Sequence, residues 1–308
     1  MQNLISDPVS MTSCRQEAYL LRLRRQFPFV YVKTLTRTAF GRSVYALQFG
    51  SGSRKLLITA GHHANETITS DAVWQWLFTF CNALLDGRTV CGAEARELYH
   101  NAMVYLVPLV NPDGADLAAG VCASGSPEYR AAADIAAQYP DIPFPSGWKA
   151  NIRGIDLNLQ YPAGWSTARE IKFAAGYTRP GPRDYVGPAP LTAPESLAMY
   201  GFTRALDPQL TLSYHTQGRV IYWQYDGYDV PGSKAIAERF AAASGYAVAE
   251  TPYASGHAGY KDWFLQDFRR PGFTIEAGSG ENPLPLSQFP DIWSDNLGIL
   301  LGGMAAVL

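Results

Sequence analysis

Residues 56–66 read LLITAGHHANE, and this stretch decides which fold the chain can adopt. Its first four residues are apolar or β-branched, which is typical of a strand buried on both faces of a sheet. A loop with two histidines and a glutamate follows. Ser70 can then cap a helix whose apolar residues recur at helical spacing as far as Leu84. A buried strand, a polar loop and a helix in this order predict an α/β fold.

The same alternation of strands and helices continues along the chain. Strands are predicted at residues 55–59, 103–110, 210–214 and 273–275. Helices are predicted at residues 233–243 and 291–307. No repeat, low-complexity tract or charged linker divides the chain, so we expect a single domain over residues 1–308. The predicted architecture is α/β, with a mixed, mostly parallel sheet sandwiched by helices and an active site at the carboxyl ends of strands.

The middle of the chain differs from its flanks. Residues 114–194 are rich in proline, glycine and aromatic residues and show little periodicity. Long irregular segments inside a compact domain usually form functional loops. We therefore expect this segment to build the walls of a cleft.

Composition argues against several classes of partner. Of the 308 residues, 47% are hydrophobic and 17% are charged, and the net charge is -2. Such a chain can bury a large core and has no overall field that would recruit nucleic acid or an anionic membrane. The four cysteines lack C-x-x-C spacing, which argues against a thiolate metal site. Residues 1–8 are polar and no stretch reaches the ~20 apolar residues of a membrane span, so we expect cytoplasmic residence.

His63 and Glu66 lie three residues apart, where the first predicted strand runs into its loop. Both side chains can therefore converge on one ion, and a catalytic zinc takes three protein ligands from histidine and carboxylate. His215 follows another predicted strand and is the candidate third ligand. Each residue alone is weak evidence, because a lone histidine in a strand is more often a hydrogen-bonded core residue. Together they favour a metal site, and His63 is preferred to His62 because only His63 has a carboxylate three residues later.

Six short segments stand out in order along the chain. They are GHHANE at 61–66, NPDG at 111–114, GIDLN at 154–158, the strand before His215, DW at 262–263 and FTIE at 273–276. With these landmarks in this order, the chain resembles the zinc carboxypeptidase family, the relatives of carboxypeptidase A, over most of its length. The resemblance implies that His63, Glu66 and His215 bind one Zn²⁺ per chain. It also implies that Glu276 is the general base, which takes a proton from water and passes it to the leaving amine.

Two further roles follow from the same resemblance. The family places an arginine for the developing oxyanion shortly before the GIDLN segment, where this chain has Lys149 and Arg153 as rivals. The family also has a tyrosine that closes over the substrate, and Tyr253 matches it if the loop differs by one residue. Each of these residues has the alternative of merely lining a loop.

The chain departs from the family after Asn158. Ordinary carboxypeptidases have an arginine next, and the Asn-Arg pair grips the C-terminal carboxylate of the substrate, whereas this chain has Leu159. Leucine cannot form such a bidentate contact, so we predict that the enzyme does not depend on a C-terminal carboxylate in the usual way. Asn158 can still hydrogen-bond the substrate.

Lys261 falls at what resembles the family's specificity position, immediately before the DW pair. An ammonium in a partly buried pocket favours a substrate with a side-chain carboxylate, and the alternative is a solvated lysine at a helix start. Arg169 and Arg183 are further candidates for contacts with anions, although each alone is more often a surface charge.

The segments GIDLNLQYP at 154–162 and PRDYVG at 182–187 resemble the bacterial γ-D-glutamyl-diamino acid peptidases. These members of the family cut the bond between γ-D-Glu and meso-diaminopimelate in cell-wall peptides. Such a substrate is rich in carboxylates, which would explain Leu159 and Lys261 together. We therefore predict a zinc metallopeptidase that acts on peptidoglycan-derived muropeptides inside the cell.

Other interpretations stay open. One is a metallocarboxypeptidase with acidic preference, in which Arg169 or Arg183 replaces the missing arginine. Another is a non-catalytic muropeptide sensor, which would have no need for Glu276. An acylamino-acid amidase with the same zinc fold is a further option, which the continuous run of peptidase landmarks disfavours. The sequence leaves the oligomeric state open.

Overall fold

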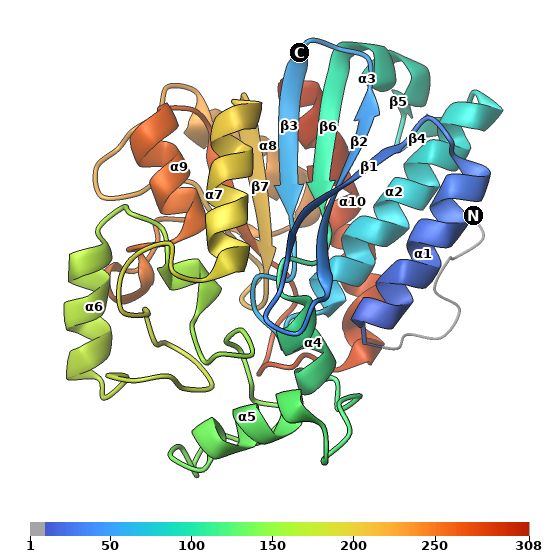
Figure 1. Cartoon of the computed structure of the whole chain (residues 1–308). Coiled ribbons are helices and arrows are strands. Elements are labelled where there is room, and N and C mark those ends of the chain that lie inside the picture. The colour runs from blue at the N-terminus through green and yellow to red at the C-terminus, as the bar shows by residue number, and fades with distance from the viewer. Residues whose placement is uncertain (1–9, 308) are drawn as a thin grey trace.

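The computed structural model describes residues 10–307, so residues 1–8, on which the expectation about targeting depends, lie outside the described part. An eight-stranded sheet has the strand order β1-β2-β6-β3-β7-β10-β8-β9. Figure 1 shows β7, β3, β6, β2 and β1 of this sheet running through the middle of the molecule. Its centre, from β6 through β3 and β7 to β10, is parallel, and the pairs β1-β2, β2-β6 and β10-β8 are antiparallel. The predicted single α/β domain with a mixed, mostly parallel sheet is confirmed.

The strands of this sheet are β1 (Tyr31–Arg37), β2 (Ser43–Gly50), β3 (Arg54–Thr59), β6 (Ala102–Val107), β7 (Leu210–His215), β8 (Val220–Tyr222), β9 (Ala247–Ala249) and β10 (Gly272–Glu276). A separate hairpin consists of β4 (Thr89–Val90) and β5 (Ala93–Glu94). The helices are α1 (Ser13–Gln26), α2 (Ile68–Asp86), α3 (Ala95–Asn101), α4 (Pro112–Ala118), α5 (Pro127–Ala136), α6 (Trp165–Ala174), α7 (Pro194–Leu206), α8 (Ser233–Ser244), α9 (Tyr260–Phe268) and α10 (Phe289–Ala306).

Helices cover both faces of the sheet, because the apolar side chains of β3 point alternately to one face and to the other. Leu56 and Ile58 pack into an apolar cluster with residues of α1, α2, α8 and α10. Leu57, between them, points to the opposite face and joins a cluster that includes residues of α7 and α9. Successive side chains of a strand point to opposite faces, so a strand covered on both sides must be apolar throughout. This explains why the run at 56–58 carries no polar residue.

Three details of the sequence-based prediction are wrong. β6 ends at Val107 rather than at residue 110, because Pro108 has no N–H for the ladder. Ser70 does not cap α2, since the helix begins two residues earlier with Thr67 at its N-cap. The segment at 114–194 is not irregular throughout, because α5 and α6 form there, and the Ser126 side chain caps α5 by accepting from the backbone N–H of Tyr129.

None of the helices within residues 10–307 has the length and apolar character that a bilayer span requires.

Glu195, at the start of α7, is a buried acid that should make stability depend on pH. Asn151 Nδ2 donates to one of its oxygens at 3.2 Å, and the other oxygen has no partner within residues 10–307. Burial raises the pKa of Glu195 from 4.5 to about 7, against the opposing effect of hydrogen bonds from the backbone and Asn151. The folded state therefore holds this proton more tightly than the unfolded state.

Glu195→Gln is expected to remove this pH dependence. A carboxyl with a raised pKa favours the folded state most below pH 4.5 and loses that advantage as the pH rises through about 7. Between pH 5.5 and pH 8 the loss amounts to roughly 2 kcal/mol. Urea unfolding of both proteins at these two pH values measures it, and the variant should gain relative stability at pH 8. A difference in unfolding free energy that is the same at both pH values would contradict the prediction.

Candidate metal centre and active site

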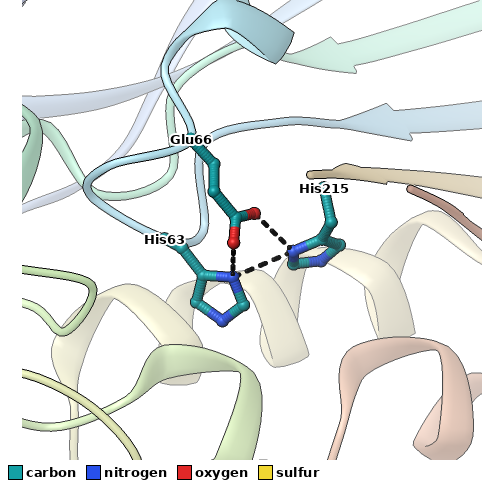
Figure 2. A group of neighbouring side chains, drawn as sticks. All are labelled: His63, Glu66 and His215. Atoms are coloured by element: carbon teal, nitrogen blue, oxygen red, sulfur yellow. Dashed lines mark hydrogen bonds and ion pairs between the residues drawn. The ribbon is translucent and has the colours of Figure 1, made fainter. Parts of the chain in front are cut away.

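The three predicted ligands come together at the carboxyl ends of two adjacent parallel strands. His63 and Glu66 lie in the loop between β3 and α2, and His215 is the last residue of β7. Figure 2 shows both rings and the carboxylate directed at one another, and one ligand atom from each residue lies within 4.8 Å of the others. Nδ1 of His63 is 2.9 Å from Oε1 of Glu66, and Nδ1 of His215 is 3.1 Å from Oε2 of Glu66. We call these three residues the ligand cluster.

The contacts within the ligand cluster fit a divalent cation. The Nδ1 atoms of His63 and His215 lie only 3.1 Å apart, so both nitrogens cannot carry a proton at the same time. A cation between them would be bound by both lone pairs and would need neither proton. Two imidazoles and one carboxylate are also the donor set of several catalytic zinc sites. The residues therefore fit a zinc ion.

The electrostatic field at the ligand cluster favours positive charge. Burial lowers the pKa of His215, which keeps this ring neutral and its lone pair available. Burial alone would also lower the pKa of His63, but the carboxylates of Glu66 and Asp156 outweigh it and raise the value to about 9. A carboxylate pair that stabilises an imidazolium stabilises a bound cation for the same reason.

Residues without a role in the sequence-based prediction hold the ligands in place. Oδ1 of Asp156 lies 3.2 Å from Nε2 of His63, and such a partner fixes the tautomer and the orientation of a metal-binding imidazole. The backbone N–H of Thr216 and the Nδ2 of Asn282 donate to Glu66 at 3.2 and 3.3 Å. Asp156 lies inside the GIDLN landmark, so the sequence could have indicated it. Asn282 is 216 residues from Glu66 and lies in no motif that could have indicated its contact with that ligand.

His62 is excluded from the ligand cluster by its direction. Its ring stacks on that of His215 with centroids 5.7 Å apart, and its Nε2 lies 3.3 Å from the hydroxyl of Tyr161. Burial lowers its pKa well below the usual range, so the ring stays neutral. The geometry agrees with the preference for His63.

Glu276 ends β10 and lies opposite His215 in the parallel register of β10 and β7. Burial raises the pKa of Glu276 to about 8, and the nearby Glu66 carboxylate adds to this, while Lys149 and His63 oppose it. A cation at the ligand cluster would lower the value, because positive charge stabilises the carboxylate. The carboxyl is thus placed to exchange protons near neutral pH.

Two hollows meet at Lys149 and Glu276. The inner pocket, of about 120 Å³, also touches His63, and its further lining includes Asn158, Leu159, Lys172, Asp184, Lys261 and Asp262. The outer pocket, of about 590 Å³, also touches Glu66, and its further lining includes Asn65, Arg183, Thr216, Gln217, Glu281 and Asn282. A substrate can therefore extend in two directions from the ligand cluster.

The zinc carboxypeptidase sequence model matches residues 16–298. The chain belongs to the zinc carboxypeptidase family. It is a metallopeptidase of this family, which uses zinc.

Three known proteins are similar to this zinc carboxypeptidase in sequence or in structure. The γ-D-glutamyl-L-diamino acid endopeptidase 1 of Lysinibacillus sphaericus is 41% identical over 285 residues, which cover 92% of this chain and 69% of that protein. Bovine thrombin-activatable fibrinolysis inhibitor, solved with tick carboxypeptidase inhibitor, superimposes with a TM-score of 0.73 at 17% identity and 97% coverage of both chains. The murein-tripeptide amidase of Escherichia coli O157 gives a TM-score of 0.53 at 19% identity, over 88% of this chain and 91% of that one. The two structures show the shared fold.

Lys149 and Arg153 were rivals for the oxyanion role in this zinc carboxypeptidase, and the structure separates them. Lys149 lines both pockets beside Glu276, whereas Arg153 is exposed and lines neither. Burial alone would lower the pKa of Lys149, but Asp156, Glu66 and Asp184 outweigh it and raise the value. The ammonium therefore stays charged next to the ligand cluster.

Asn158 and Lys261 both line the inner pocket. The Oδ1 of Asn158 accepts from the backbone N–H of Tyr260 at 2.9 Å, and its Nδ2 donates to no other group within residues 10–307. The alternative of a solvated Lys261 is wrong, because its side chain is only 4% exposed. Its Nζ lies 2.6 Å from Asp262 Oδ1 and donates to the carbonyl of Gln224 at 2.8 Å.

The remaining predicted substrate contacts of this zinc carboxypeptidase lie further from the ligand cluster. Tyr253 is 70% exposed and lines neither pocket. Arg169 is exposed on α6 with its guanidinium 4.4 Å from the ring centre of Phe173, and it also lines neither pocket. Arg183 lines the outer pocket and donates to Asp184 at 2.6 Å. Of these three residues, Arg183 alone lines one of the two pockets at the ligand cluster.

Proposed function

We propose that this zinc carboxypeptidase hydrolyses the bond between γ-D-glutamate and meso-diaminopimelate in peptidoglycan-derived peptides. The observation that carries the proposal is the inner pocket, which has Leu159 where carboxypeptidases have an arginine and is lined by three lysines, Lys149, Lys172 and Lys261. A buried ammonium favours a negatively charged substrate group. The 41% identical relative, named a γ-D-glutamyl-L-diamino acid endopeptidase, supports the same bond.

In this proposal His63, Glu66 and His215 hold the zinc ion. Zinc at such a site polarises a peptide carbonyl and makes water more acidic. Glu276 takes a proton from the attacking water as the water oxygen bonds to the carbonyl carbon. Glu276 then passes that proton to the amine when the C–N bond breaks. Lys149, which lies beside Glu276 and the ligand cluster, stabilises the negative charge that develops on the carbonyl oxygen.

Mass spectrometry of a defined muropeptide tests the proposed bond. Zinc-loaded protein should convert L-Ala-γ-D-Glu-meso-diaminopimelate into L-Ala-D-Glu and free diaminopimelate. An intact tripeptide, together with release of ordinary C-terminal residues from linear peptides, would favour the metallocarboxypeptidase with acidic preference instead. Binding of the tripeptide without any hydrolysis would favour the sensor. The location of the enzyme in the cell and its place in muropeptide recycling stay predictions.

A further inference from the structure

α6 brings a lysine to the inner pocket that no landmark indicated. Ala168, in the middle of this helix, is buried in a small apolar cluster with Leu159, Val186 and Ala258. Lys172 stands four residues later, on the same face of the helix, and lines the inner pocket together with Leu159. The pocket wall around Leu159 therefore receives a positively charged side chain, Lys172, from α6.

The ammonium of Lys172 is held by one carboxylate and keeps donors to spare. Its Nζ lies 2.6 Å from Oδ1 of Asp184, and the side chains are 17% and 9% exposed. The other oxygen of Asp184 accepts from Nε of Arg183 at 2.6 Å. A lysine ammonium has three N–H donors, and within residues 10–307 the hydrogen bonds of Lys172 go to Asp184 alone. Lys172 can therefore donate to a ligand without losing its partner.

Asp184 fixes this ammonium relative to the ligand cluster. Its φ is +64°, a left-handed backbone conformation that is uncommon for a residue other than glycine. The backbone N–H of Asp184 donates to Oδ2 of Asp156 at 3.3 Å, and the other oxygen of Asp156 contacts His63. A chain of polar contacts thus connects Lys172 to a predicted zinc ligand. Such a connection positions the ammonium before a substrate arrives.

The other ammonium groups of the inner pocket are less available to a substrate. Lys261 already has two acceptors, Asp262 and the carbonyl of Gln224, and its side chain is only 4% exposed. Lys149 lies at the junction of the two pockets, beside Glu276, where the scissile bond must bind. Of these three lysines, Lys172 is the one with unused donors that does not lie at the junction of the two pockets.

We propose that Lys172 binds a carboxylate of the diaminopimelate that is released, from the wall of the inner pocket that has Leu159 in place of an arginine. This rests on the proposed peptidase function. The Nδ2 of Asn158, on the same pocket, supplies the second donor to that carboxylate. Two groups of the leaving diaminopimelate have this chemistry, the main-chain carboxylate beside the scissile bond and the distal side-chain carboxylate.

Three peptides distinguish these two carboxylates. The first is L-Ala-γ-D-Glu-meso-diaminopimelate, the second carries an amide in place of the main-chain carboxylate of the last residue, and the third ends in L-lysine and so lacks the distal carboxylate. Lys172→Met should lower kcat/KM for the first peptide by about 10- to 100-fold, the range expected for a hydrogen bond to a charged group. It should change kcat/KM less than threefold for the peptide that lacks the carboxylate bound by Lys172. The peptide on which Lys172→Met has little effect therefore shows which of the two carboxylates Lys172 binds.

Control variants separate recognition from folding. Lys172→Arg keeps the charge and should recover most of the lost kcat/KM, while Lys234→Met, on the exposed side of α8, should behave as the wild type. Equal losses on all three peptides, or no loss on any, would overturn the role of Lys172. Failure of the wild type on every peptide would instead overturn the proposed function, and the inference with it.

Discussion

Replacing Glu276 with glutamine is expected to lower kcat by about 10²- to 10⁴-fold, the usual contribution of a general acid-base group. Glutamine has nearly the same shape but cannot take a proton from water. Glu276 is not one of the three residues of the ligand cluster, so the variant should still bind zinc. The loss should therefore appear in kcat with a normal metal content.

Single-turnover hydrolysis of the muropeptide, with elemental analysis of the same samples, measures this effect. Glu238→Gln, on the exposed side of α8, is the matched control and should keep full activity. A Glu276→Gln enzyme that turns over at the wild-type rate would show that another group acts as the base. A normal biological role for this inactive variant would favour the sensor.

His215→Ala should abolish both zinc binding and hydrolysis. The substitution leaves two ligands, from one short loop, and removes the only ligand supplied by β7. Losing a residue that merely supports a ligand typically weakens metal binding 10- to 100-fold. Asp156→Asn, which alters such a support of His63, should fall in that range, and His215→Ala should lose considerably more.

Competition between each variant and a zinc-binding dye gives the affinities. Chelation should inactivate the wild type, and added zinc should restore it. His100→Ala, an exposed histidine on α3, serves as the control for loss of a histidine. Zinc affinity of His215→Ala equal to that of the wild type would rule out the ligand cluster as the metal site.

Much of the centre of this enzyme was open to prediction from sequence, because its signals are local. Apolar runs reveal the buried strands β3, β7 and β10, and side chains just beyond parallel strands must meet at one edge of the sheet. That rule brings His63, Glu66 and His215 together, with Glu276 beside them. The N-terminal strand β1 escaped prediction, because this edge strand is largely exposed and lacks a regular apolar alternation.

The linear sequence therefore determined the fold class, the central strands β3, β7 and β10 and the residues at their carboxyl ends, since each depends on near neighbours in the chain. Tertiary structure alone decided which charged residues face the cleft. Arg169 and Lys172 lie three residues apart on one helix, yet only Lys172 lines the inner pocket. Its partner Asp184 connects in turn to Asp156, 28 residues earlier. Such choices depend on how α6 packs and on contacts between distant segments, which no local pattern encodes.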